Sequence, residues 1–305
     1  MRVKRLFIAF ALGLGLTLAL TLALGTIEGW LPAVRAAGFT VTKFTDTNDG
    51  VCDADCSLRE AIIAANANGE PDTITLGNGT YILSLAGAGE DEAATGDLDI
   101  TGPLTITGQG PDQTVIDANG IDRAFDIRPG AGTVVISGVT IMGGNVTGDG
   151  GGIYNYNADL ALVNTHLVSN TATNGGGLYV RWGSATLNGG RIVSNTANTF
   201  GGGVYIYRGS VTLSEGEIAD NSASSGGGGM YISGGRATLS GGQILGNSAR
   251  FGAGVEVVNT NAFFIQTGGV ISGNAATNKA GGVNVIYGSA TLSEGAVISN
   301  TAADD

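Results

Sequence analysis

The chain has little proline, charge, histidine and cysteine for its length. Of its 305 residues only five are proline, one is histidine, two are cysteine and 13% are charged. No proline follows Pro129, so every later backbone N–H can take part in a β-ladder. One histidine and two cysteines leave few of the ligands that zinc sites use. The scarcity of Lys and Arg, with a net charge of −12, argues against a nucleic-acid partner.

Glycine and apolar residues take the place of the missing types. There are 54 glycines, and 43% of the residues are hydrophobic. The glycines show no collagen-like triplet period, and the hydrophobic content is too high for a disordered chain. Glycine also recurs too often for long helices to form. This composition predicts an all-β protein with many short strands joined by tight turns.

The N-terminus has the pattern of a secretory signal. A basic start at residues 1–5 precedes an apolar run, 6–24, and then small residues that end at Ala36. We predict a signal peptide over residues 1–36, cleaved after Ala36. The apolar run is almost long enough for a membrane span, so an uncleaved signal segment stays open as the one membrane contact. Either outcome predicts a secreted or cell-surface protein.

An internal repeat of about 26 residues covers most of the chain. Asparagine recurs with spacings of 25 to 27 residues, at Asn145, Asn170, Asn195, Asn221, Asn247, Asn274 and Asn300. Glycine clusters and apolar positions keep the same register, and one apolar set consists of Leu162, Leu187, Leu213, Leu239, Phe264 and Leu292. Each copy contains three short alternating segments separated by Gly, Ser or Asn, which predicts three strands per copy.

The repeat predicts a right-handed parallel β-helix, in which coils of about 26 residues stack on one another. Each strand then pairs with its equivalent in the next coil, about 4.8 Å away. We expect the recurring Asn at a corner, in the left-handed region of backbone space, with its side chain stacked in a structural ladder along the axis. We assign residues 96–305 to this repeat domain.

A short helix is expected before the first coil, because the open end of a solenoid needs a cover. Ser57 and Glu60 have the spacing of a capping box that opens a helix. One face of that helix is apolar, with Leu58, Ala61, Ile62 and Ala65 at helical spacing. We assign residues 37–95 to this N-terminal cap and the first strands.

The loop before the helix contains both cysteines and several carboxylates. Export permits a disulfide, and we expect one between Cys52 and Cys56. The loop is rich in oxygen, which suits calcium, although the spacing departs from the EF-hand pattern; its oxygen-bearing residues include Asp46, Asn48, Asp49, Asp53 and Asp55. A polar loop of Asx turns is the alternative. We assign no metal site and no cofactor.

The six residues 56–61 spell Cys-Ser-Leu-Arg-Glu-Ala, and they resemble the motif of the CSLREA-type N-terminal domain. The Gly-Gly-X and Asn repeats look like those of polymorphic outer membrane proteins and of pectate-lyase-like β-helix families. The resemblance covers nearly the whole chain after the signal segment. It implies an exported protein with a parallel β-helix, and it implies no catalytic residue.

A β-helix can be an enzyme or an adhesin, so function has to be inferred from the site. Enzymes that resemble pectate lyases use clustered Asp for calcium and an Arg or Lys as base. From Gly150 onward, acidic residues are few and do not recur at the coil period. We therefore assign no catalytic residue and favour a non-catalytic structural or adhesin-like protein. A polysaccharide lyase or glycoside hydrolase is the alternative.

Strand alternation after each glycine cluster predicts an exposed aromatic surface. Its first column consists of Tyr154, Tyr179, Tyr205 and Tyr231, and the next of Tyr156, Arg181 and Tyr207, flanked by Trp182 and Arg208. Aromatic faces beside Arg suit sugar rings or a protein, so we predict binding of a polysaccharide or a surface protein here. A tyrosine ladder that only stabilises the sheet is the alternative.

The sequence stops one corner into a coil, at Asp304 and Asp305, with no second cap. We expect either a longer natural chain or an end-to-end contact with a partner at this end.

Overall fold

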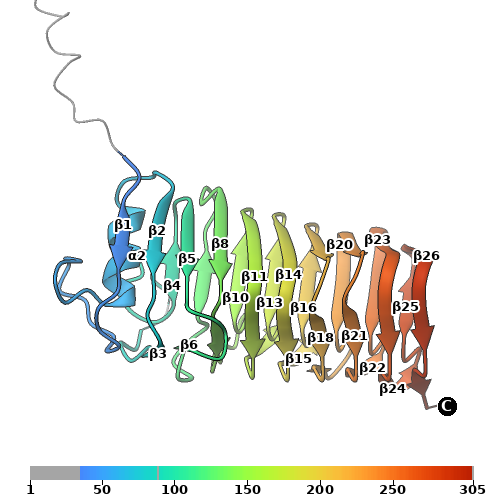
Figure 1. The fold of residues 1–305 in the computed structure, drawn as a ribbon. Coiled ribbons are helices and arrows are strands. Elements are labelled where there is room, and N and C mark those ends of the chain that lie inside the picture. Colours follow the sequence, from blue (N-terminus) through green and yellow to red (C-terminus); the bar gives the residue numbers. More distant parts are fainter. Residues whose placement is uncertain (1–34, 88, 304–305) are drawn as a thin grey trace, which may run out of the picture. The chain divides into compact units, whose positions relative to one another are not determined.

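The computed structural model (Figure 1) describes residues 35–87 and 89–303, and Ala36–Asp305 form one compact unit. The predicted parallel β-helix is confirmed, because all its sheets are parallel and the chain makes about eight turns of a solenoid. The predicted signal peptide falls outside the described residues, apart from Arg35 and Ala36. Within the described part of the chain, no helix has the length and apolar character to cross a bilayer.

Three long faces run along the solenoid, and each coil adds one strand to each face. Face A consists of β4 (Leu98–Ile100), β7 (Phe125–Ile127), β10 (Ile153–Tyr156), β13 (Leu178–Arg181), β16 (Val204–Tyr207), the first parts of β20 (Met230–Leu239) and β23 (Val255–Ser272), and β25 (Val283–Ile286).

Face B follows face A around each coil. It consists of β1 (Gly38–Thr40), β2 (Asp72–Thr75), β5 (Leu104–Thr107), β8 (Thr133–Ser137), the first parts of β11 (Asp159–Val168) and β14 (Ser184–Val193), β17 (Ser210–Leu213), later parts of β20 and β23, and the first part of β26 (Ser289–Ile298).

Face C completes the coil. It consists of β3 (Gly79–Ile82), β6 (Thr114–Asp117), β9 (Thr140–Met142), the ends of β11 and β14, β18 (Glu217–Ala219), β21 (Gln243–Leu245), and the ends of β23 and β26.

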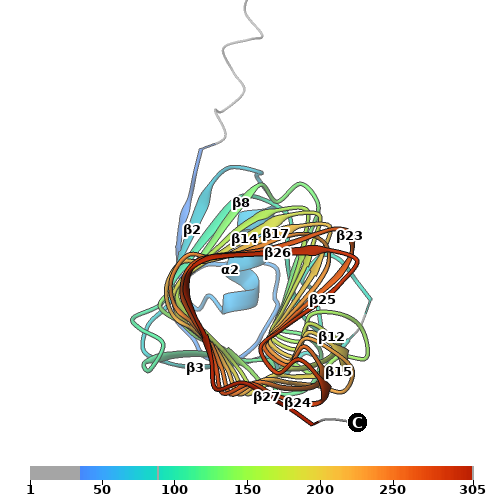
Figure 2. The same ribbon diagram turned by 90° about the vertical axis from the view of Figure 1, so that its right-hand side faces the viewer.

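The inward side chains of the three faces form one apolar core. On face A, Ile153, Leu178 and Val204 lie in register on successive coils and are completely buried. Each such side chain contributes about 1.5–3 kcal/mol by leaving water. The view along the axis (Figure 2) shows the coils superposed, with the helix α2 (Leu58–Asn66) inside their outline.

A fourth strand in most coils was missing from the three-strand prediction. It follows the Asn corner and forms a separate six-stranded sheet of β12 (Thr171–Asn174), β15 (Thr196–Phe200), β19 (Ser222–Ala223), β22 (Ser248–Phe251), β24 (Ala275–Lys279) and β27 (Thr301–Ala302). These segments are short and polar and contain Ala where the longer strands have large apolar residues, so the sequence gives them little strand signal. The stacking of the coils alone brings them into pairing distance.

The predicted Asn ladder is present, and its amides bond along the axis. Asn195 Nδ2 donates to Asn221 Oδ1 (3.0 Å), and Asn221 Nδ2 donates to Asn247 Oδ1 (3.0 Å). The same oxygens also accept backbone N–H groups, because Asn195 N donates to Asn221 Oδ1 at 2.9 Å. The ladder extends from Asn170 to Asn300 with the same geometry. It therefore satisfies both backbone and side-chain groups at this corner.

Two details of that prediction were wrong. The left-handed residue is the one before the Asn, such as Ser194 (φ 57°) or Asp220 (φ 52°), and it turns the next side chain inward. Asn195 and Asn221 are consequently completely buried, whereas we expected them on an outer corner. In addition, Asn145 is not part of the ladder. It pairs with Thr171, and the backbone of Gly144 occupies the first position instead.

The apolar set on face B also differs at one coil. Gln266, not Phe264, lies in register with Leu239 and Leu292, because β23 contains extra residues at its corner and the register shifts there. Phe264 is fully buried two residues earlier, beside Ala237. A sequence period alone cannot locate such an insertion inside a coil.

The predicted cap is confirmed. Helix α2 begins after Ser57, whose side chain accepts from the backbone of Glu60, and the Glu60 carboxylate accepts from the backbone of Ser57. The predicted apolar face is buried, and Cys52 and Cys56 form the expected disulfide. The helix thus covers apolar side chains that the first coil would otherwise expose.

Arg59 holds the cap to the first coils. Its guanidinium is completely buried and forms a two-pronged ion pair with Asp46, with Nε–Oδ1 at 2.7 Å and Nη2–Oδ2 at 3.1 Å. It also donates to the carbonyl oxygens of Ala93 (2.9 Å) and Gly96 (2.9 Å). Asp46 Oδ2 in turn accepts the N–H of Ser84. The residues of the 56–61 motif that the sequence analysis identified are therefore occupied in structural contacts.

Removing one Asn of the ladder should destabilise the whole solenoid. Asn221→Ala leaves the backbone N–H and one of the two side-chain N–H groups of Asn195 without an acceptor and Asn247 Oδ1 without one of its donors, all in the buried interior. We expect a loss of about 2–4 kcal/mol, measured by chemical denaturation. Asn198→Ala, at an exposed position of the preceding coil, should change stability by less than about 0.5 kcal/mol. Equal effects of the two variants would contradict the structural role of the ladder.

The buried ion pair gives a second prediction. Arg59→Met leaves Asp46 buried without its cation, which we expect to cost about 3–5 kcal/mol of stability. The double variant Asp46→Asn, Arg59→Met removes the uncompensated charge as well and should recover part of that loss. Thermal unfolding of the three proteins measures both effects. Additive losses would show that the two side chains act independently.

Candidate functional site

Face A has an outward column of four stacked tyrosines, in the predicted register. Tyr154, Tyr179, Tyr205 and Tyr231 pair on successive strands. Ring centroids lie 5.3 Å apart for Tyr154–Tyr179, 4.7 Å for Tyr179–Tyr205 and 5.0 Å for Tyr205–Tyr231. Such cross-strand stacking stabilises the sheet beyond simple burial of area.

The expected exposure of this tyrosine column was wrong. Tyr179 is 6% exposed and Tyr231 is 8% exposed, and burial raises the pKa of both phenols. Their cover is a shoulder, the column Asp149, Asn174, Phe200, Gly226 and Phe251 that runs beside face A. Phe200 packs on Tyr231 with ring centroids 4.4 Å apart. The shoulder belongs to the strands that the sequence analysis missed, so this burial could not be anticipated.

The second predicted column remains accessible at the outer edge of face A. We call Tyr156, Arg181, Trp182, Tyr207 and Arg208 the aromatic–arginine strip. The ring of Trp182 lies 5.4 Å from that of Tyr156 and 6.2 Å from that of Tyr207. The Arg181 guanidinium lies over Tyr156 (4.9 Å) and Trp182 (4.5 Å), and Arg208 lies over Tyr207 (5.3 Å). Aromatic and cationic groups therefore alternate along the edge.

The two arginines of the strip carry charge that this part of the protein does not neutralise. Within the described residues, neither Arg181 nor Arg208 forms an ion pair. Arg181 Nη1 bonds to the Tyr154 hydroxyl (3.2 Å), which raises the pKa of Arg181, whereas its buried Nε has no hydrogen-bond partner. Guanidinium donors thus remain free to bind an oxygen-rich ligand.

The backbone at the corner of the strip is strained. Trp182 has φ 60° and Arg208 has φ 56°, in the left-handed region that L-residues with large side chains rarely adopt. The corresponding corners of neighbouring coils have Asn157 and Gly234, which tolerate this conformation. Trp182 is also 41% exposed, so its large side chain adds little to the core.

A group of carboxylates and arginines that the sequence analysis missed lies upstream of the tyrosines. Asp99 pairs with Asp126, and Asp126 pairs with Tyr154, so the two carboxylates continue the tyrosine column toward the cap. Arg123 lies 2.7 Å and Arg128 lies 3.1 Å from Asp126 Oδ2. The sequence signal for these carboxylates is the repeated apolar-Asp-Ile pattern at 98–100 and 125–127, in the less regular coils before Gly150.

Solvent does not reach these carboxylates directly. Asp99 is completely buried and Asp126 is 4% exposed, beneath residues 89–97. Burial raises the pKa of Asp99 to about 7 and that of nearby Asp97 to about 8. Carboxyls that keep a proton at neutral pH are common at functional sites, although buried ion-pair networks show the same shifts.

The loop considered for calcium uses its oxygens within the protein. Asp46 binds Arg59, and Asp49 Oδ1 and Asp53 Oδ1 accept backbone N–H groups two residues on, as in Asx turns. Among the residues that the structure describes, no three His, Cys, Asp or Glu side chains are arranged to hold a metal ion.

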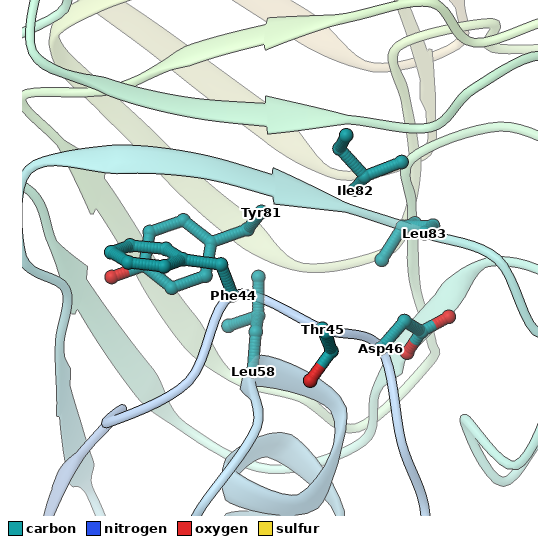
Figure 3. Close-up of a pocket in the computed structure, with 7 residues that line it drawn as sticks. All are labelled: Phe44, Thr45, Asp46, Leu58, Tyr81, Ile82 and Leu83. Atoms are coloured by element: carbon teal, nitrogen blue, oxygen red, sulfur yellow. The ribbon is translucent and has the colours of Figure 1, made fainter.

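A small pocket lies in the cap, away from the strip. Figure 3 shows Phe44 beside Tyr81 at its rim, with Asp46 and Leu83 on the other side. Its volume is about 10 Å³, which is close to the space of one water molecule. The pocket is therefore too small for a sugar ring.

Comparison of the chain with protein-family models, with curated proteins and with solved structures finds no match.

Proposed function

We propose that the protein is an exported, non-catalytic β-helix that binds glycans through the aromatic–arginine strip. The observation that carries this proposal is the conformation of Trp182, an exposed indole on a left-handed backbone. A large side chain in this region costs about 1–2 kcal/mol relative to glycine. Burial does not offset that cost here, so a role in binding is the better explanation.

The chemistry of the strip suits a carbohydrate. The apolar face of a sugar ring can pack on Trp182, Tyr156 or Tyr207, while guanidinium groups donate to hydroxyl or carboxylate oxygens. Coils repeat about every 4.8 Å along the axis, so an extended polymer can contact several of them at once. Many weak contacts along one chain add up to useful avidity. A surface protein is the other partner that this surface would suit.

The proposal also includes export of the protein from the cytoplasm and its place in a family of exported β-helix proteins. The signal pattern of residues 1–36 and the Cys52–Cys56 disulfide both suit an extracytoplasmic protein. The residues 56–61 and the glycine and asparagine repeats support a place among CSLREA-type exported proteins with pectate-lyase-like β-helices. An adhesin-like or structural role at the cell surface follows from these features together.

The alternative, a polysaccharide lyase or glycoside hydrolase, is favoured by one observation. Asp97, Asp99 and Asp126 lie beside Arg123 and Arg128, which is the combination of groups that our sequence search did not find. However, residues 89–97 cover these carboxylates, so a sugar chain on the surface does not reach them. Binding without cleavage is therefore the function that we propose.

Replacing Trp182 separates binding from stability. Trp182→Gly relieves the left-handed backbone, so we expect unchanged stability or a gain of up to about 1 kcal/mol. Loss of the indole should weaken retention about tenfold or more, which corresponds to about 1.4 kcal/mol. Affinity electrophoresis through gels that contain individual polysaccharides measures retention, and thermal unfolding measures stability.

The matched control is Phe263→Ala, because Phe263 is equally exposed (42%) but lies on face B. This variant should migrate like the unmodified protein in every gel. If Trp182→Gly also leaves retention unchanged in all the gels that retard the parent protein, or if no glycan retards the parent protein, the proposal of glycan binding is wrong.

A separate assay distinguishes binding from cleavage. Incubation with pectin and related glycans should release no new unsaturated or reducing ends, because the carboxylates are covered. Ultraviolet absorbance and a reducing-sugar assay measure the two products. Release of either product, abolished by Asp126→Asn, would establish the enzymatic alternative.

A further inference from the structure

The two buried aspartates that continue the tyrosine column leave polar atoms without partners. Asp99 on β4 and Asp126 on β7 are in-register neighbours on adjacent parallel strands. Both carboxyls are at least nine-tenths buried, and Asp99 Oδ1 and Asp126 Oδ1 each have no hydrogen-bond donor. Two buried carboxylates on neighbouring strands repel each other when both are ionised.

Charges around the pair do not balance if every group is ionised. The titratable and charged groups that surround it come from the segment 89–97, from both strands, from the cap and from the next coil: Glu90, Asp91, Asp97, Asp122, Arg123, Arg128, Arg59 with its partner Asp46, and Tyr154. Arg59 is already paired, so two arginines face Asp91, Asp97, Asp99 and Asp126. A net negative charge in a buried cluster favours the uptake of protons.

Arg123 and Arg128 favour an ionised Asp126, so Asp99 is the carboxyl that favours a proton. Arg123 and Arg128 both bond to Asp126 Oδ2, whereas Asp99 has no cation within bonding distance and accepts only the N–H of Ala93. Burial raises the pKa of both carboxyls, with that of Asp99 at about 7, and the arginines oppose this rise at Asp126. One proton between the two Oδ1 atoms would satisfy both of them.

Residues 89–97, which we call the strap, close over this pair. Ala93 N donates to Asp99 Oδ2 at 2.9 Å, and Asp91 binds Arg128 at 2.8 Å. Ala93 is itself completely buried, so it can leave its place only if the strap opens. One contact that holds the strap down is thus made to Asp99 itself and another to Arg128, which also binds Asp126, while Arg59 holds the strap from the cap side.

We propose that Asp99 and Asp126 hold one proton between them and act as a pH-sensitive latch, which keeps the strap closed when protonated and releases it when ionised. Release would let water reach the carboxylates and would expose the upstream end of the tyrosine column. The proposal depends on residues outside the aromatic–arginine strip, so it stands or falls independently of glycan binding.

The direction of the pH effect follows from linkage. In the open strap an exposed Asp has an ordinary pKa near 3.9, whereas closure keeps Asp99 protonated up to about pH 7. Closure is therefore fully favoured below about pH 4 and loses stability as pH rises to about 7. Asp97, with a pKa of about 8, extends the same trend if it also releases its proton. This direction is opposite to that of most salt-bridged carboxylates.

Hydrogen exchange on the full chain tests the latch. We expect the protection factor of Ala93 N–H, corrected for intrinsic exchange, to fall by on the order of 100-fold between pH 5 and pH 7. Backbone amides of the Asn ladder, such as that of Asn221, should keep their protection over the same range. Equal protection of the strap at pH 5 and pH 8 would overturn the proposal.

Neutral substitutions sharpen the test. Asp99→Asn places an N–H₂ group where the shared proton would be, so strap protection at pH 8 should rise at least tenfold and its pH dependence should become shallower. Asp126→Asn should likewise flatten the pH dependence. Asp112→Asn, at an exposed carboxylate, is the matched control and should behave as the parent protein does. An unchanged pH dependence in both latch variants would contradict the proposal.

Two further measurements cover other outcomes. If the variants do not fold, ¹³C-carboxyl NMR of the parent protein decides, because a protonated Asp99 at pH 6 supports the latch and full ionisation there overturns it. Calcium alone, added at pH 8, should leave the strap open. If calcium restores protection and a chelator removes it, a metal ion occupies the place that we assign to the proton, and the latch is wrong.

Discussion

Backbone pairing between successive coils is the interaction on which the rest of the structure depends. Each residue lies above its counterpart about one repeat earlier in the chain. Equivalent residues of successive coils therefore form a column along the axis, and each side chain lies between the equivalent side chains of the two neighbouring coils. This is why polar groups that a single coil could not bury, such as the amide of Asn221, become satisfied in a stack. It is also why the stacked tyrosines, the strip and the buried carboxylates form lines, not isolated sites.

The sequence predicts which residues stack on one another in successive coils better than it predicts which other residues cover them. The repeat was sufficient to align Tyr179 with Tyr205, and the capping box was sufficient to place the helix, because both depend on local spacing. Burial of Tyr179 depends on the shoulder, whose strands are short and polar and give little strand signal in the sequence. The shift of Phe264 depends on an insertion whose position inside the coil is set only by packing.

The buried carboxylates Asp99 and Asp126 could not be identified from the sequence for a different reason. Asp99 and Asp126 occur in similar short strands, yet the intervening turns differ in length and contain proline, so the repeat is hard to follow there. Their importance comes from the strap and from Arg123 and Arg128, which fold back over them in three dimensions. Composition and spacing alone do not reveal that a carboxylate will be enclosed, and enclosure decides whether it carries a charge or a proton.

The asparagine ladder has a direction. From Asn170 to Asn274, every side-chain amide donates to the Asn of the next coil, and Asn300 accepts the last of these bonds, so the amide dipoles all point the same way along the axis. Aligned bonds of this kind strengthen one another. The line can therefore be lengthened by copying a whole coil in the same orientation, because the new amide joins both neighbours. The common direction of the Asn side-chain bonds thus makes this fold suited to growth by duplication of whole coils.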